Sequence, residues 1–257
     1  DSMTADDLRV FADFLSSDYD ISMNTIVTNM TLMRTVCNWV RKQGVTNNDP
    51  FFGYDMPKAL YGTPYFLTIQ ERDQVLDADL TDDAELAEYR DMFVFQCMVG
   101  CRHSDLVTFT PKNIIDGVLE YIPIKTKGKL GDVVRVPLIP KAMAILDGHD
   151  HGDDEPIFPK HYNFKFNDAI RRILKRAKVN RVVTVINPKT RLEEKKPISD
   201  VATSHLARRT FIGNLYRMVK DPDLVASMSG HAKGSVAFAR YRVIDDDMKK
   251  SLVELIQ

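Results

Sequence analysis

Apolar residues recur at helical spacing near the start of the chain. Between Leu8 and Leu15 they fall at i, i+3 and i+4, the spacing of a helix with one buried face. After Ser22, a residue suited to cap a helix N-terminus, a second apolar stripe runs to Gly44. The two stripes comprise Leu8, Phe11, Phe14 and Leu15, then Ile26, Met30, Met33, Val36, Cys37 and Val40. This pattern predicts two amphipathic helices.

The segment that follows is rich in residues that break regular structure. Pro50, Pro57 and Pro64 interrupt it, together with Gly53 and Gly62. This is the strongest linker signal in the sequence. We therefore predict a domain boundary that separates a helical domain over residues 1–62 from a second domain over residues 63–257.

The second domain is predicted to combine helices with short strands. Thr68 and Glu71 form the pattern of a capping box, and residues 84–101 are apolar enough for a long helix. Two β-rich runs flank a Lys/Gly turn, at 118–125 and 132–138, and a second hairpin is expected around Asn187–Lys189. Further helices are expected at 140–147, 163–178, 203–219, 221–229 and 234–241, before an amphipathic tail at 245–257. The predicted fold class is mostly α with small β-hairpins, an α+β arrangement.

Composition narrows the class of protein. With 257 residues, 44% hydrophobic and 28% charged, the sequence is typical of soluble globular proteins. It holds no run of about 18 apolar residues and no visible signal peptide, and its three cysteines suggest reduced thiols. We therefore expect a cytoplasmic protein without a membrane span. The acids and histidines at 149–155 are interpreted as a solvated loop rather than a metal site.

The net charge of −1 conceals a strong asymmetry along the chain. Residues 160–250 carry 21 Lys and Arg against 9 Asp and Glu, whereas residues 63–159 carry 9 against 18. A basic region in a neutral protein indicates a surface that faces a polyanion, or else a solvated charged face. Four cations lie on one predicted helix, namely Arg171, Arg172, Lys175 and Arg176.

Four separated segments carry candidate chemistry. They read G-C-R-H-S-D-L (100–106), I-K-T-K-G-K (124–129), H-L-A-R-R-T-F (205–211) and S-G-H…Y (229–241). Taken singly, each has an ordinary explanation: a surface arginine, a structural histidine, a core tyrosine. Their order along the chain, Arg, Lys, His-x-x-Arg, Gly-His and Tyr, favours a single composite site.

This ordered set closely resembles the motifs of the tyrosine recombinases, the phage integrase family. The S-D-L and H-L-A-R-R-T-F spellings, with a hairpin ahead of the histidine, look most like integrases of conjugative or mobilisable transposons. The resemblance covers nearly the whole chain. It implies a core-binding (SAM-like) DNA-binding domain over 1–62 and a catalytic domain over 63–257. Val-Gly-Cys-Arg replaces the family's usual Thr-Gly-Leu-Arg, and the arm-binding domain of many integrases is not part of this sequence.

The resemblance also implies a reaction and a role for each site residue. Tyr241 would attack a scissile DNA phosphate, giving a 3′-phosphotyrosyl link and a free 5′-hydroxyl, without a metal or a cofactor. Arg102 and Arg208 would bind the phosphoryl oxygens through their forked guanidinium groups. His205 would hydrogen-bond the phosphate or accept the tyrosine proton, and His231 would donate to a non-bridging oxygen.

Two further roles complete the implied site. Lys125, at a strand-to-turn junction, matches the general acid for the leaving 5′-oxygen, with Lys127 and Lys129 as alternatives on the same turn. Asp105 would support the site from behind Arg102. The four cations of the basic helix are further candidates for DNA contact.

The partners implied by the resemblance are double-stranded DNA with a specific core or att-type site, and further copies of the chain. We expect a monomer without DNA and a homotetramer on DNA, in which the tail 245–257 docks on a neighbouring protomer or packs on its own domain. Accessory DNA-bending proteins and a bacterial, nucleoid-associated location are also expected. Two alternative functions remain open: a type IB topoisomerase-like relaxing enzyme, and a catalytically silent DNA-binding relative.

Overall fold

The computed structural model describes residues 2–19, 21–126, 133–149, 152–219, 221–231 and 253. The chain divides into two compact units. Unit 1 comprises residues 1–62 and 184–195, and unit 2 comprises residues 63–183 and 196–257. No helix within the described residues is long and apolar enough to cross a membrane.

Unit 1 contains the two helices that the apolar pattern predicted. Helix α1 spans Ala5–Ser17 and helix α2 spans Met23–Lys42. The Ser22 side chain accepts a hydrogen bond from the Thr25 backbone N–H, so the predicted N-cap is confirmed. Leu8, Ile26 and Met30 form the buried core between the helices.

Two predicted core positions of unit 1 are instead exposed. Val36 is 59% exposed because it lies off the stripe that faces α1. Phe14 is 43% exposed, and its ring packs edge-on against Tyr19, with the ring centroids 5.2 Å apart. The spacing of apolar residues predicted the helices correctly but overstated the width of the buried face.

The predicted second hairpin is present and its tip belongs to unit 1. Strand β4 spans Val182–Ile186 and strand β5 spans Glu193–Pro197. The Pro188 carbonyl accepts a hydrogen bond from the Met23 N–H at 3.4 Å. The Arg191 guanidinium donates to the Lys58 carbonyl at 2.9 Å. These contacts explain why residues 184–195 group with residues that precede them by more than a hundred positions.

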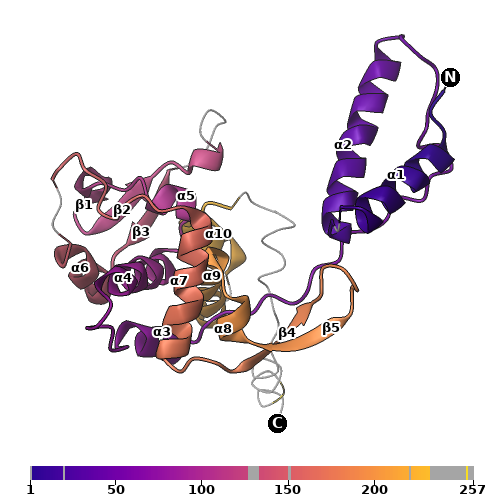
Figure 1. Ribbon diagram of the computed structural model, residues 1–257. Helices are drawn as coiled ribbons and strands as arrows, with labels where there is room; N and C mark the ends of the chain where they lie inside the picture. The colour runs from indigo at the N-terminus through magenta and orange to yellow at the C-terminus, as the bar shows by residue number, and fades with distance from the viewer. Residues whose placement is uncertain are drawn as a thin grey trace. The chain divides into compact units, whose positions relative to one another are not determined.

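Unit 2 is built around helix α4. Its helices are α3 (Ile69–Leu76), α4 (Ala84–Val99), α5 (His103–Leu106), α6 (Pro140–Asp147), α7 (Asn163–Arg176), α8 (Ile198–Val201), α9 (Ser204–Val219) and α10 (Pro222–Ser229). The α4 helix packs against α3, α6, α7 and α9 (Figure 1). Its residues from Met92 to Val99 are all buried. The capping box of Thr68 and Glu71 at the start of α3 is confirmed. Helix α8 was not predicted.

Helix α4 ends at Val99, two residues earlier than predicted, because of Gly100. Gly100 has φ +69°, a left-handed conformation that L residues with a side chain adopt only at a cost. A Cβ atom here would lie 2.2 Å from the Phe211 ring, which reaches across from α9. Both the backbone and the packing therefore require glycine at the start of the Arg102 segment.

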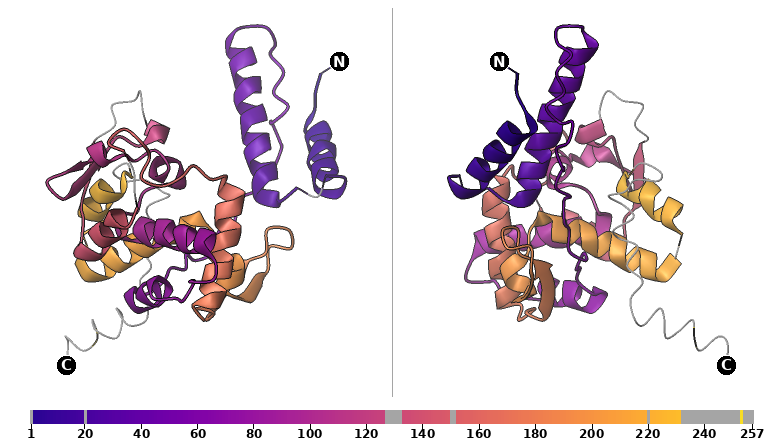
Figure 2. Two further views of the ribbon diagram at one scale, coloured as in Figure 1. Left: turned by 60° about the vertical axis from the view of Figure 1, so that its left-hand side comes forward. Right: turned by 90° about the vertical axis from the view of Figure 1, so that its right-hand side faces the viewer.

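A three-stranded antiparallel sheet forms the second part of unit 2. It consists of β1 (Ile114–Ile115), β2 (Val118–Tyr121) and β3 (Val134–Pro137), with β2 in the middle and β3 packed against α10 (Figure 2). A short 3₁₀ helix, η1 (Pro111–Asn113), precedes β1. The register pairs Leu119 with Val136, which are both buried. Strand β1 was not predicted.

The strand predicted over 118–125 is too long. The chain leaves the sheet after Tyr121, because Pro123 lacks the N–H needed to extend a ladder. Ile124–Thr126 then form a short 3₁₀ helix, η2. Lys125 therefore stands in a helical turn, not at the end of a strand. The predicted helix at 234–241 and all of the tail 245–257 except Val253 lie outside the described residues.

Candidate functional site

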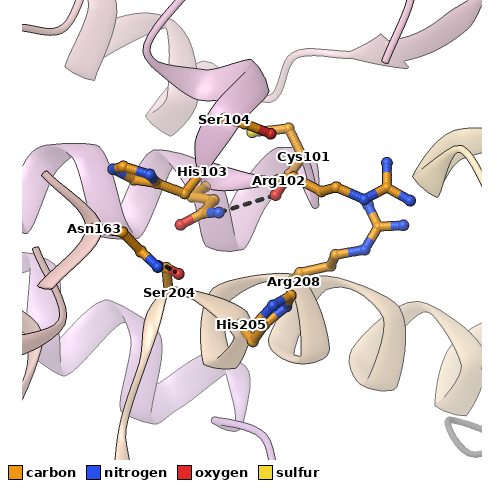
Figure 3. Close-up of a pocket in the computed structure, with 9 residues that line it drawn as sticks. Cys101, Arg102, His103, Ser104, Asn163, Ser204, His205 and Arg208 are labelled. Atoms are coloured by element: carbon orange, nitrogen blue, oxygen red, sulfur yellow. Dashed lines mark hydrogen bonds between the residues drawn. The ribbon is translucent and has the colours of Figure 1, made fainter. Parts of the chain in front are cut away.

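Two of the four motif segments, 100–106 and 205–211, line a polar pocket in unit 2, and a third meets it through the contact of His231 with Arg208. The pocket has a volume of about 300 Å³ (Figure 3). Its lining residues are Gln96, Cys101, Arg102, His103, Ser104, Asn163, Ser204, His205 and Arg208. They come from the end of α4, from α5, and from the N-terminal ends of α7 and α9. The pocket thus joins segments that lie more than a hundred residues apart.

Arg208 is held rigidly at this pocket. Its side chain is buried on α9, with 3% of the residue exposed. One guanidinium nitrogen donates to the Gly100 carbonyl at 2.7 Å, and the other lies 3.0 Å from Nδ1 of His231. The same His231 nitrogen lies 2.9 Å from the Ser229 hydroxyl. One guanidinium group of α9 therefore links the C-terminal end of α4 to the C-terminal end of α10.

Arg102 approaches the same end of the pocket from the N-cap position of α5. The Gln96 side chain donates to the Cys101 carbonyl at 2.9 Å, which holds the backbone just before Arg102. The Nη1 atom of Arg102 is buried and has no hydrogen-bond partner within the described part of the chain. Figure 3 shows the guanidinium groups of Arg102 and Arg208 directed toward the same end of the pocket. Two such forks suit the oxygens of a phosphodiester.

Asp105 connects Arg102 to the segment that carries Lys125. The residue is 1% exposed, and its Oδ1 atom accepts the Ile124 backbone N–H at 2.9 Å. Oδ2 lies 4.0 Å from Nη1 of Arg102. A buried carboxylate thus orients one cation and, through the adjacent backbone, the turn that carries another.

The two histidines of the motifs lie in a field of positive charge. Burial, followed by Arg208, Arg102 and Lys125, lowers the pKa of His231 to about 3. Partial burial, followed by the charges of Arg209, Arg208, Arg102 and Lys125, also lowers the pKa of His205. Both rings are therefore neutral at pH 7, and each offers one donor and one acceptor nitrogen. The shared perturbation also places Lys125 within electrostatic range of both histidines.

The structure brings together Arg102, Asp105, Lys125, His205, Arg208 and His231. Gly230 ends α10 with φ +64°, a left-handed cap that directly precedes His231. Tyr241, Lys127 and Lys129 lie outside the described residues.

The four cations of α7 all pair with carboxylates. The pairs are Arg171–Asp168 at 3.4 Å, Arg172–Asp83 at 2.8 Å, Lys175–Asp200 at 2.8 Å and Arg176–Asp82 at 2.6 Å. All eight side chains are at least partly exposed, so each pair contributes little to stability. A DNA phosphate would have to compete with these carboxylates.

Sequence reasoning missed several residues of the pocket. Asn163 accepts a hydrogen bond from the Ser204 hydroxyl at 3.1 Å, which ties α7 to α9 one residue before His205. Gln96 is a polar residue inside the run M-F-V-F-Q-C-M-V, and this anomaly in a buried helix could have revealed it. No comparable signal marks Asn163, because its role depends on a contact 41 residues away.

The described residues hold no group of three or more His, Cys, Asp or Glu that could bind a metal ion. Cys97 and Cys101 are free thiols, fully buried, and burial raises the pKa of both. The ionisable nitrogen groups that line the pocket are the guanidinium groups of Arg102 and Arg208 and the imidazole rings of His103 and His205.

Residues 65–248 match the sequence model of the phage integrase family. Among solved structures, the Tn1549 transposon integrase in complex with circular intermediate DNA has a TM-score of 0.70 and 17% identity, with 98% of this chain and 85% of that chain covered. Lambda integrase, a dimer bound to a COC′ core site, has a TM-score of 0.66 and 14% identity, with 95% and 81% covered. XerH recombinase in a pre-cleavage complex with difH has a TM-score of 0.62 and 16% identity, with 99% and 71% covered. No curated protein matches the chain.

Proposed function

The chain belongs to the phage integrase family of tyrosine recombinases, and from this premise we propose that Tyr241 is the nucleophile of a site-specific DNA recombinase. The observation that carries the proposal is the pair of guanidinium groups of Arg102 and Arg208, directed toward one end of a polar pocket beside two neutral histidines. Such a constellation suits a phosphodiester whose oxygens gain negative charge in the transition state.

The cleavage step balances as a transesterification. The Tyr241 oxygen forms a bond to phosphorus as the bond from phosphorus to the 5′-oxygen breaks, which leaves a 3′-phosphotyrosyl link. His205 is suited to accept the tyrosine proton, because burial and then the nearby cations lower the pKa of its ring and favour its neutral form. The Lys125 ammonium is suited to protonate the leaving oxygen, with Lys127 or Lys129 as alternatives. Rejoining is the reverse of these transfers.

His231 and Arg208 act as one unit in this proposal. The Arg208 guanidinium, 3.0 Å from Nδ1 of His231, and the Ser229 hydroxyl hold the imidazole ring in place in the absence of DNA. A preorganised donor reduces the reorganisation needed as phosphoryl charge develops. Asp105 orients Arg102 and the Lys125 turn without contacting the reacting atoms.

Double-stranded DNA with a core or att-type site is the proposed substrate, as for the structural neighbours that are complexed with DNA. Residues 1–62 are proposed to bind DNA, and residues 63–257 to catalyse. We further propose a homotetramer on DNA, docking of the tail 245–257 on a neighbouring protomer, assistance from DNA-bending proteins, and a bacterial, nucleoid-associated location. DNA contacts of Arg171, Arg172, Lys175 and Arg176 belong to the same proposal.

Covalent capture tests the proposed nucleophile. The probe is a library of nicked duplexes with randomised sequence beside the nick, so that cleavage releases a short fragment and traps the protein on DNA. We expect a protein–DNA adduct that survives denaturant, and sequencing of the captured DNA then reports the preferred site. An adduct absent from every member of the library would contradict the proposal.

Two variants make the capture specific. Tyr241→Phe should abolish the adduct, whereas Tyr121→Phe should retain it. Tyr121 is a suitable control because its hydroxyl is buried and has no hydrogen-bond partner among the residues described. Relaxation of a supercoiled plasmid without strand exchange between two captured sites would favour the topoisomerase-like alternative.

A further inference from the structure

Two large aromatic side chains stand exposed beside the pocket. Tyr162 is 75% exposed and Phe164 is 68% exposed, and both lie at the start of α7. Their rings are nearly parallel, with an interplanar angle of 23° and centroids 6.1 Å apart. Exposure of two aromatic rings costs hydrophobic free energy that burial would recover, so a paired, solvent-facing arrangement points to a binding surface.

The residue between the two rings ties them to the candidate site. Asn163 lines the pocket, and its hydrogen bond with Ser204 fixes the start of α7 against the helix that carries His205. Because consecutive Cα atoms are about 3.8 Å apart, both aromatic residues lie within one residue of the pocket wall. Figure 3 shows Asn163 at the opposite end of the pocket from the guanidinium groups of Arg102 and Arg208.

The chemistry around the rings favours a nucleotide over an apolar partner. Lys160 and Lys165 are exposed on either side of the pair, and the adjoining pocket is rich in arginine and histidine. A strand whose phosphate is bound by Arg102 and Arg208 would carry its next nucleotide along the pocket, since successive bases are only about 3.4 Å apart along a strand axis. Cationic groups for the backbone beside aromatic faces for the bases form the usual combination for single strands.

Strand exchange creates such a single-stranded segment. After cleavage, the bases beside the cut must leave their original partners before they can pair with another duplex. Unpaired bases expose their faces to water, and stacking on aromatic side chains lowers that cost for any base sequence.

We propose that Tyr162 and Phe164 form a stacking site, at the Asn163 end of the pocket, for an unpaired base of the strand whose phosphate Arg102 and Arg208 bind at the other end. This inference rests on the proposed recombinase function. Neither residue takes part in bond breaking, and the pair acts by holding a base in its unpaired state.

Equilibrium binding tests the stacking site. The probes are two pools of fluorescent duplexes with randomised sequence, one fully paired and one with a short central stretch of mismatched bases. We expect the unsubstituted protein to bind the mismatched pool more tightly. The double variant Tyr162→Ala and Phe164→Ala should lose this preference, with mismatched-pool affinity reduced about 5- to 100-fold and paired-pool affinity unchanged.

Two controls separate stacking from a general loss of apolar surface. Tyr162→Phe combined with Phe164→Tyr keeps both rings and should keep the preference. Met218→Ala removes an exposed apolar side chain of the same unit, 72% exposed, and should also keep it. A 2-aminopurine base in the mismatched stretch should be quenched by the unsubstituted protein and not by the double alanine variant.

The outcomes distinguish the two proposals. A preference for mismatched DNA that survives the double alanine substitution, or is absent from the unsubstituted protein, overturns the stacking site. If a covalent adduct forms but the stacking site is overturned in this way, the recombinase function is still supported. Loss of preference in the variant without any covalent adduct would support the stacking site and contradict the nucleophile.

Discussion

The Asp105 carboxylate accepts the backbone N–H of Ile124 at 2.9 Å, which makes one buried side chain the link between two motifs 19 residues apart. Its other oxygen faces Arg102 at 4.0 Å. The position of Lys125 relative to Arg102 therefore depends on a residue that need not contact DNA.

Substitution of Asp105 should separate its two contacts. Asp105→Asn retains an oxygen for Ile124 and removes the negative charge near Arg102, whereas Asp105→Ala removes both. We expect Asp105→Ala to lower the free energy of unfolding by about 1–3 kcal/mol, because a partly buried N–H loses its partner, and Asp105→Asn by about 1 kcal/mol or less. Urea unfolding measures both. Equal stability of Asp105→Ala and the unsubstituted protein would contradict the assigned contact.

A methyl group at Gly100 should destabilise the fold for two reasons, a clash with Phe211 and a left-handed backbone conformation. A matched substitution at Gly117 separates the two. Gly100→Ala places a Cβ 2.2 Å from the Phe211 ring and in a left-handed conformation, and we expect a loss of about 3 kcal/mol or more. Gly117 has φ +75°, and a Cβ added there would meet nothing within 4 Å, so Gly117→Ala should cost only about 1 kcal/mol. Thermal unfolding of both variants checks this, and similar losses would mean that the Phe211 contact relaxes.

Even the conservative substitution Arg208→Lys should slow the formation of the covalent adduct. A lysine has one point charge in place of the fork that reaches both the Gly100 carbonyl and His231. We expect Arg208→Lys to slow adduct formation about 100- to 1,000-fold, comparable to loss of a preorganised donor elsewhere. The neighbouring Arg209 lies over the Tyr65 ring at 5.2 Å, so Arg209→Lys should change the rate only slightly. Rates of covalent capture measure both, and equal effects of the two substitutions would contradict the special role of Arg208.

The lowered pKa of His231 predicts a dependence of stability on pH. The folded pKa of about 3 lies below the unfolded value of 6.5, so the unfolded state binds more protons between these limits. The His231 contribution to folding is therefore fully present above about pH 6.5 and is lost as the pH falls toward about 3. His103 and His205 shift in the same direction, so all three contribute to the trend.

A His231→Asn variant isolates this contribution. Its free energy of unfolding should fall less steeply than that of the unsubstituted protein between about pH 6.5 and 5, a range above the titration of most carboxylates. Urea unfolding at several pH values measures the two slopes. Parallel slopes would show that the His231 ring is not held neutral by its surroundings.

Local signals in the sequence were sufficient for most of the secondary structure. Ser22, Thr68 and Gly230 act on backbone groups within a few residues, so their capping roles are legible from the chain alone. The same holds for the apolar spacing of α2 and α4. Where the prediction failed, as at Val36 and at residues 122–125, the outcome depended on which face met a neighbour and where a ladder could continue.

The order of the motif residues could also be read from the sequence, and that order predicted the family that the sequence model matches. The characteristic spelling of each motif predicts Arg102, His205, Arg208 and His231 as site residues. The order of these residues along the chain does not reveal which contacts hold their side chains in place.

Only the tertiary structure decided which groups the supporting residues contact and which cations are already paired. Asp105 meets Ile124, Asn163 meets Ser204, and Arg176 meets Asp82 through contacts spanning 19, 41 and 94 residues. A periodic pattern reports which face of an element is buried, since that depends on neighbours within a turn or two. Pairing between polar groups depends instead on how elements pack, and that geometry exists only once the chain has folded.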